Sequence, residues 1–184
     1  MIRGGTSKAM KSHAKYLILG LLYGLWPNLV NAEELGNWSL AQSKAPDGTI
    51  IFKASLSASN LITASSGPDY APIYSIGCSH GDVLHWSQTL QLEDGVSGSG
   101  QIELSAKIDE KNRREEIWMI GKSNKTLTRE NTPDIAELRS ANHLKLSWNW
   151  GWSWMWLADK AKFQLGDVEA VIFTLAKSCG IAEP

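Results

Sequence analysis

The chain has 184 residues, 43% of them hydrophobic, and its 18 lysines and arginines against 19 aspartates and glutamates give a formal net charge of −1 at pH 7. All 19 acidic residues but only 14 of the cationic ones lie after residue 32, which leaves residues 33–184 with a net charge of −5. The one basic cluster, Lys111-Asn112-Arg113-Arg114, is followed directly by Glu115 and Glu116 and indicates a solvated turn. Nucleic acids and anionic membrane surfaces attract proteins through clustered cations, so this composition argues against both as partners.

The first 32 residues have the pattern of a secretory signal peptide. Four basic residues precede an almost wholly apolar run over 16–26, and Val30-Asn31-Ala32 supplies small residues ahead of a cleavage site. A membrane anchor needs roughly 20 apolar residues, and this run ends sooner, at Pro27. We therefore expect cleavage after Ala32, one mature domain over 33–184 without a transmembrane anchor, and a bacterial location in the periplasm or outside the cell.

The chain holds two cysteines, Cys78 and Cys179, and both lie after the predicted cleavage site. An even pair in an exported protein indicates a disulfide, whereas a metal site would need a Cys-x-x-Cys or histidine-rich spacing that the sequence lacks. Closing a loop of about 100 residues is worth roughly 4–5 kcal/mol of unfolding free energy in the chain-entropy model.

Alternating apolar and polar residues predict a series of antiparallel strands. The segments that carry this pattern are 37–42, 49–57, 73–79, 83–92 and 102–108, with a long loop over 57–72 that is rich in Ser, Ala, Gly and Pro. The run 117–120 is continuously apolar, which is typical of a strand buried on both faces.

Two helices are expected after these strands. Thr132-Pro133-Asp134 supplies a helix start, predicting a short helix near 133–142. An apolar stripe that ends at Cys179, with Gly180 as the stop, predicts a C-terminal helix near 167–179. The expected fold is mainly β, with antiparallel strands and with the last helix held on the sheet by the disulfide.

The order of landmarks resembles a family of small periplasmic proteins of bacterial type VI secretion, called VasI- or TagO-like. The resemblance rests on an early strand at Trp38, Ile76-Gly77-Cys78 before an aromatic strand, Trp118, the strands at 144–146 and 163–165, and a final helix ending in Cys179. The chain departs from the family at Gly77, where a basic residue is common, and in its tryptophan cluster. The resemblance implies a compact β-sandwich-like accessory protein without established catalytic residues.

That cluster places Trp148, Trp150, Trp152, Trp154 and Trp156 at every second position. On a strand these rings would share one face over roughly 26 Å. One interpretation is that they fill the core, with Trp148 continuing the inward register of the preceding leucines. The other is that Gly151 and Ser153 bend the segment and expose Trp150, Trp152 and Trp154 as a contact surface, since indole rings stack on sugars and polypeptide.

No motif predicts catalysis, a metal site or a cofactor. Ser79-His80-Gly81-Asp82 is read as a turn, because adjacent residues rarely aim their side chains at one point. We therefore expect a protein that is not an enzyme: a type VI secretion accessory protein that binds a protein partner in the cell envelope or secretion apparatus. The alternative is a glycan- or peptidoglycan-binding module that uses the Trp-rich segment 148–156.

Overall fold

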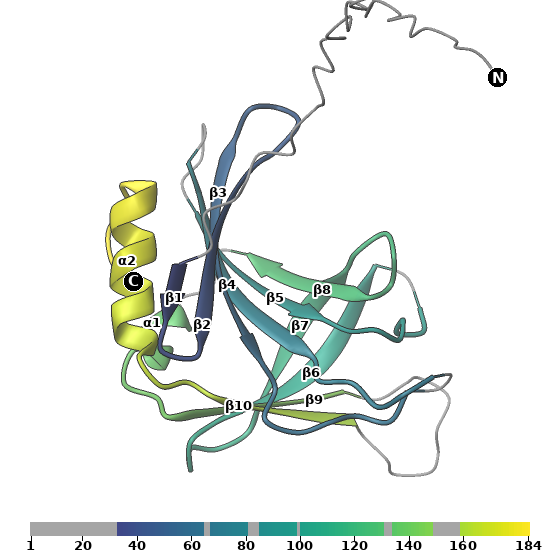
Figure 1. The fold of residues 1–184 in the computed structure, drawn as a ribbon. Coiled ribbons are helices and arrows are strands. Elements are labelled where there is room, and N and C mark those ends of the chain that lie inside the picture. Colours follow the sequence, from purple (N-terminus) through teal and green to yellow (C-terminus); the bar gives the residue numbers. More distant parts are fainter. Residues whose placement is uncertain (1–32, 65–66, 81–84, 99, 131–133, 149–158) are drawn as a thin grey trace, which may run out of the picture.

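The computed structural model describes residues 33–64, 67–80, 85–98, 100–130, 134–148 and 159–184 (Figure 1). Its strands are β1 (Glu33–Leu35), β2 (Trp38–Lys44), β3 (Ile50–Ser57), β4 (Ile73–His80), β5 (His85–Gln91), β6 (Gln101–Ile108), β7 (Arg114–Ile120), β8 (Thr126–Glu130), β9 (His143–Trp148) and β10 (Asp159–Gln164). The helices are α1 (Ile135–Leu138) and α2 (Val168–Cys179). The predicted mainly β fold with a short helix and a C-terminal helix is confirmed.

All ten strands belong to one antiparallel sheet, in the order β1-β2-β3-β4-β5-β8-β7-β6-β9-β10. The sheet is strongly curved, and the turn between β2 and β3 points away from β9 and β10 (Figure 1). The side chains of one face point inward and form the core; its largest fully buried members are Trp38, Trp118, Trp148, Tyr74 and Phe163. Alternation along each strand therefore assigns every second residue to the outer face.

The strand β7 differs from its prediction. The run 117–120 was expected to be buried on both faces, but Ile117 and Met119 are 52% and 53% exposed, whereas Trp118 between them is fully buried. The prediction is wrong because β7 alternates like its neighbours: Glu115 also points outward and Glu116 inward. A continuous apolar run does not distinguish a strand buried on both faces from one with an apolar outer face.

Helix α2 covers part of the curved sheet and packs on β3 and β4. Its buried residues are those of the predicted apolar stripe, Val168, Val171, Ile172, Leu175 and Cys179, together with Ala176. Gly180 ends the helix in a left-handed conformation, with φ of 65°, which glycine adopts without steric cost. The predicted stop is confirmed.

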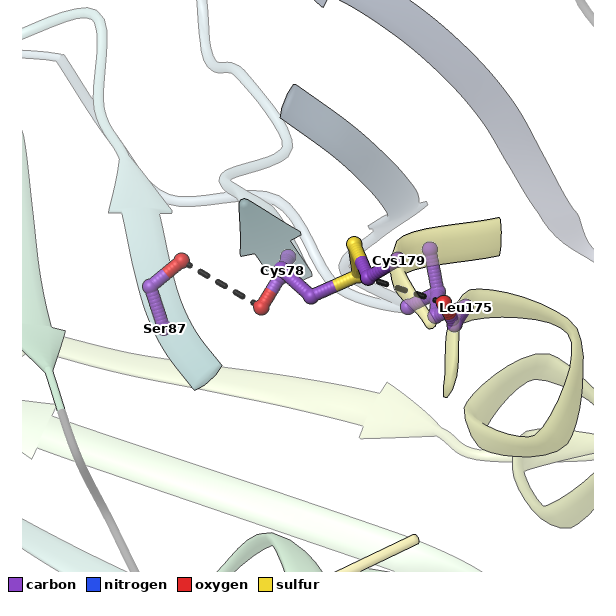
Figure 2. The surroundings of a disulfide bond; sticks show 5 residues. Cys78, Ser87, Leu175 and Cys179 are labelled. Carbon is purple, nitrogen blue, oxygen red and sulfur yellow. Dashed lines mark hydrogen bonds between the residues drawn. A yellow bond between two sulfur atoms is a disulfide. The ribbon is translucent and has the colours of Figure 1, made fainter. Parts of the chain in front are cut away.

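A disulfide joins Cys78 on β4 to Cys179 at the end of α2, with 6.2 Å between their Cα atoms (Figure 2). Both cysteines are buried, and the Cys78 sulfur lies 3.2 Å from the carbonyl oxygen of Leu175. On the other side of β4, Ser87 donates a hydrogen bond to the Gly77 carbonyl. The disulfide therefore fastens the last helix to the middle of the sheet.

The two edges of the sheet are arranged differently. At β10, Lys162 donates its backbone N–H to the side-chain oxygen of Asn60, and the Lys162 carbonyl accepts from the backbone N–H of Ser59. The segment that follows β3 thus covers the edge of β10. The opposite edge is β1, which is three residues long and begins with Glu33 and Glu34.

Candidate functional site

A hollow of about 520 Å³ opens where β2, β3, β4 and β10 meet. Six of its eight lining residues are polar, and the full set is Asn37, Ser39, Ser55, Leu56, Ser57, Ser59, Ile73 and Gln164. Its volume falls within the range of pockets that hold small ligands, roughly 300–1,000 Å³. The hollow is therefore large enough for a compact organic ligand or part of a longer one.

The strand register accounts for the polar lining. Ser39 on β2 pairs with Ser55 on β3, and Ser55 pairs with Ser75 on β4, so three serines cross the sheet on its outer face. The hydroxyl oxygens of Ser55 and Ser75 lie 3.0 Å apart in a hydrogen bond, and Ser75 is only 2% exposed. Ser57, two residues farther along β3, is exposed and points to the same side. Its hydroxyl is open to a ligand.

The lining of the hollow suits recognition rather than chemistry. Its polar side chains are hydroxyls and amides, which donate and accept hydrogen bonds without carrying charge. A serine nucleophile needs an adjacent base, and none of the eight lining residues has an ionisable side chain that could serve as one. The hollow can thus hold a neutral, hydroxyl-rich or peptide-like ligand by hydrogen bonds.

Of the five clustered tryptophans, the structure describes only Trp148. Trp148 ends β9 and is 2% exposed, which confirms the expectation that it continues the inward register of Leu144 and Leu146. Its indole N–H is buried and has no hydrogen-bond partner among the residues that the structure describes. Trp150, Trp152 and Trp154, the predicted contact residues, lie outside the described residues, as does Trp156. Their role in binding stays a prediction.

The turn around His80 falls largely outside the described part of the chain, since residues 81–84 are not included. His143 lies at the start of β9, where its Nδ1 is 3.4 Å from a carboxylate oxygen of Asp109. That carboxylate also accepts the backbone N–H groups of Asn142 and His143, so Asp109 links the end of β6 to the start of β9. This arrangement is structural.

A charged cluster lies on the inner face of the sheet under α1. The Glu116 carboxylate, 3% exposed, accepts hydrogen bonds from Arg114 at 2.6 Å and from Trp118 at 3.0 Å, and lies 3.1 Å from Arg129. Both arginines also pair with Asp134, the residue before α1. Arg114 was expected in a solvated turn, and that prediction is wrong because its side chain turns inward to Glu116.

The same cluster holds the start of the short first helix. The helix was expected near 133–142 but extends only over Ile135–Leu138, and Asp134 makes no side-chain hydrogen bond to the helix backbone. Its carboxylate is instead taken by the two arginines, which hold the start of α1 on β7 and β8. Burial raises the pKa of the neighbouring Tyr74 well above its usual range, and the Tyr74 hydroxyl donates to Gln88. The charged groups of the cluster are paired with one another.

Within the described ranges, no group of three or more histidine, cysteine or acidic side chains has the geometry of a metal site. In the same residues, no helix has the length and apolar character needed to cross a membrane.

The sequence reasoning missed the hollow. Its signal was present as outward serines at matching positions of neighbouring strands, but recognising it requires the register between β2, β3 and β4. Models of protein families, curated protein sequences and solved structures were compared with this chain, and none of them matches it.

Proposed function

We propose that this chain is an exported binding protein of the bacterial cell envelope that acts by recognition and not by catalysis. The observation that carries the proposal is the hollow at the junction of β2, β3, β4 and β10, which has hydroxyl and amide groups but no ionisable side chain in its lining. The Cys78–Cys179 disulfide supports an oxidising compartment, because cytosolic thiols are kept reduced. The proposed mature chain is 33–184.

Export is tested by the N-terminus of the mature protein. Full-length chain expressed in a Gram-negative host should be recovered from the periplasm with Glu33 as its first residue, because signal peptidase requires a small residue before the cleaved bond. Ala32→Arg should leave an uncleaved precursor, whereas the matched change Ala41→Arg, inside β2, should be cleaved normally. N-terminal sequencing and intact mass check this. Wild-type chain that keeps residues 1–32 and stays in the cytoplasm would contradict export.

The association with type VI secretion rests on the order of sequence landmarks described above. The proposed partner is a protein of the envelope or of the secretion apparatus. The neighbouring genes decide between this partner and others: a type VI secretion cluster beside the coding sequence supports it, and the lack of such a cluster in the genome overturns it.

Glycan binding is the second candidate, favoured by the chemistry of the hollow. Sugar hydroxyls exchange hydrogen bonds with serine hydroxyls and with the amides of Asn37 and Gln164. The sequence adds Trp150, Trp152 and Trp154 as stacking residues. Binding by the hollow and binding by the tryptophans can be tested separately, because the two sets of residues lie in different parts of the chain.

Ser57→Leu should weaken binding of soluble peptidoglycan fragments at least tenfold, because the added side chain occupies the hollow. Ser43→Leu is the matched control, since Ser43 is an exposed strand serine outside the lining. Titration calorimetry measures both, alongside a variant in which Trp150, Trp152 and Trp154 are alanine. Loss in that triple variant alone assigns the glycan to the tryptophans, and wild-type protein that binds no fragment refutes the glycan candidate.

Trp148→Ala should instead lower the unfolding midpoint, since it truncates a buried ring.

A further inference from the structure

The edge of β10 that faces β3 is only partly closed. At one end, Trp38 donates its indole N–H to the carbonyl of Gly166, two residues after β10. At the other end, the Lys162 carbonyl accepts the backbone N–H of Ser59. Gln164 lies between these two contacts, which are separated by at most about 14 Å of extended chain. We call this short open stretch the window. It opens into the hollow, whose lining includes Gln164.

The backbone of Gln164 points into the window. The N–H and C=O groups of Lys162 point away from β9, since Asn60 and Ser59 bond to them. Backbone groups two residues apart on an antiparallel strand point the same way, so those of Gln164 also turn toward β3. No strand in the described part of the chain pairs with β10 on this side. One N–H donor and one C=O acceptor are thus offered to a ligand in the hollow.

Asn60 shows which chemical group fits this edge. Its side-chain oxygen accepts the Lys162 N–H at 2.8 Å, and its side-chain N–H donates to the Lys160 carbonyl at 2.8 Å. One amide therefore satisfies both kinds of backbone group on β10. A ligand amide can bind at Gln164 with the same two bonds: its oxygen accepts the Gln164 N–H, and its N–H donates to a β10 carbonyl.

The rest of the lining selects among ligands that carry an amide. A partner's strand would have to continue along β10, but the contacts at Lys162 and Gly166 close the edge on both sides of the window. A sugar with an acetamido group presents a single amide and needs no such length. Its hydroxyls can exchange hydrogen bonds with Ser39 and Ser57, and its methyl group can lie against Ile73.

We propose that the hollow recognises an N-acetylated amino sugar, whose acetamido group binds the backbone of Gln164. The inference rests on the glycan candidate of the proposed function and narrows it, because the site then selects the acetamido group and not sugar hydroxyls in general. The glycan strands of peptidoglycan consist of N-acetylated sugars, so this class of ligand is present in the proposed compartment.

The test is titration calorimetry of the mature, disulfide-linked protein with two trisaccharides of the same linkage, one of N-acetylglucosamine and one of glucose. The N-acetylglucosamine trimer should bind at least about tenfold more tightly, because the glucose trimer lacks the amide that pairs with Gln164. Gln164→Pro deletes the backbone N–H at an edge position, where proline is tolerated. It should weaken the N-acetylglucosamine trimer about tenfold and leave the glucose trimer unchanged.

Gln164→Ala is the matched control. It removes the side-chain amide but keeps the backbone N–H, and it should change binding of either trimer less than about threefold. An unfolding midpoint of Gln164→Pro equal to that of the wild type excludes a loss of fold. A second readout needs no variant: the NMR signal of the Gln164 backbone amide should shift with the N-acetylglucosamine trimer and not with the glucose trimer.

Equal binding of the two trimers, weakened in both cases by Ser57→Leu, would overturn the acetamido inference and leave glycan binding in place. Binding of neither trimer refutes the inference and the glycan candidate together. Binding of N-acetyl-trialanine amide that Gln164→Pro abolishes, without binding of either trimer, would assign the hollow to a polypeptide and refute the sugar.

Discussion

Replacing Cys78 and Cys179 together by alanine should lower the free energy of unfolding by about 4–5 kcal/mol. The disulfide closes a loop with a sequence separation of 101 residues, and the chain-entropy model gives this value because the unfolded chain gains the freedom that the bond had removed. The loss is comparable with the whole stability of many domains, about 5–15 kcal/mol. The variant should therefore be close to half unfolded at physiological temperature if the protein lies near the lower limit.

Urea unfolding followed by tryptophan fluorescence measures this change. Reducing the wild-type protein should reproduce the midpoint of the double variant, since both lack the same bond. A midpoint that is equal in the oxidised protein and in the double variant would falsify the stabilising role of the disulfide. Proteolysis of the double variant should begin in α2, whose covalent link to β4 is lost.

Glu116→Ala should cost about 3–5 kcal/mol of unfolding free energy. The carboxylate is 3% exposed and lies against two arginines, so its removal leaves two partly buried positive charges that share only Asp134. It also leaves the buried indole N–H of Trp118 without its acceptor. Few single substitutions at a surface position have an effect of this size.

Glu115→Ala is the matched control, because Glu115 is the adjacent carboxylate but points outward from β7. It should change the unfolding free energy by less than about 0.5 kcal/mol. Glu116→Gln should fall between the two, since the amide oxygen can accept from Trp118 while the charge is lost. Similar unfolding midpoints for Glu115→Ala and Glu116→Ala would show that the arginines are satisfied without Glu116.

Much of the fold could be predicted from alternation and end signals. The strands β2 to β6 follow period-two patterns, and α2 follows a stripe with a glycine stop, because local sequence decides which face is buried. The two failures have different causes. The apolar run 117–120 hides the alternation of β7, which leaves Ile117 and Met119 exposed. Asp134 pairs with arginines of β7 and β8, and a local pattern does not show those contacts.

The candidate sites depended even more on register. Ser39 and Ser55 are 16 residues apart and become neighbours through strand pairing, and Ser57 and Gln164 are 107 apart, yet both line the hollow. A single sequence gives the face of each residue on its strand but not the residue opposite. The tryptophans at 150, 152 and 154 remain predictions because they lie outside the described residues.

The way in which the two edge strands, β1 and β10, are protected affects self-association. An open strand edge is a template on which a second chain can add a strand, the first step toward polymers and amyloid. Here Asn60 and Ser59 occupy the hydrogen-bonding groups of Lys162 at one edge, and the other edge is a three-residue strand that carries two glutamates. A short charged edge repels a second copy of itself. The protein can thus be concentrated, on a surface or in a confined compartment, without its sheet growing from one molecule into the next.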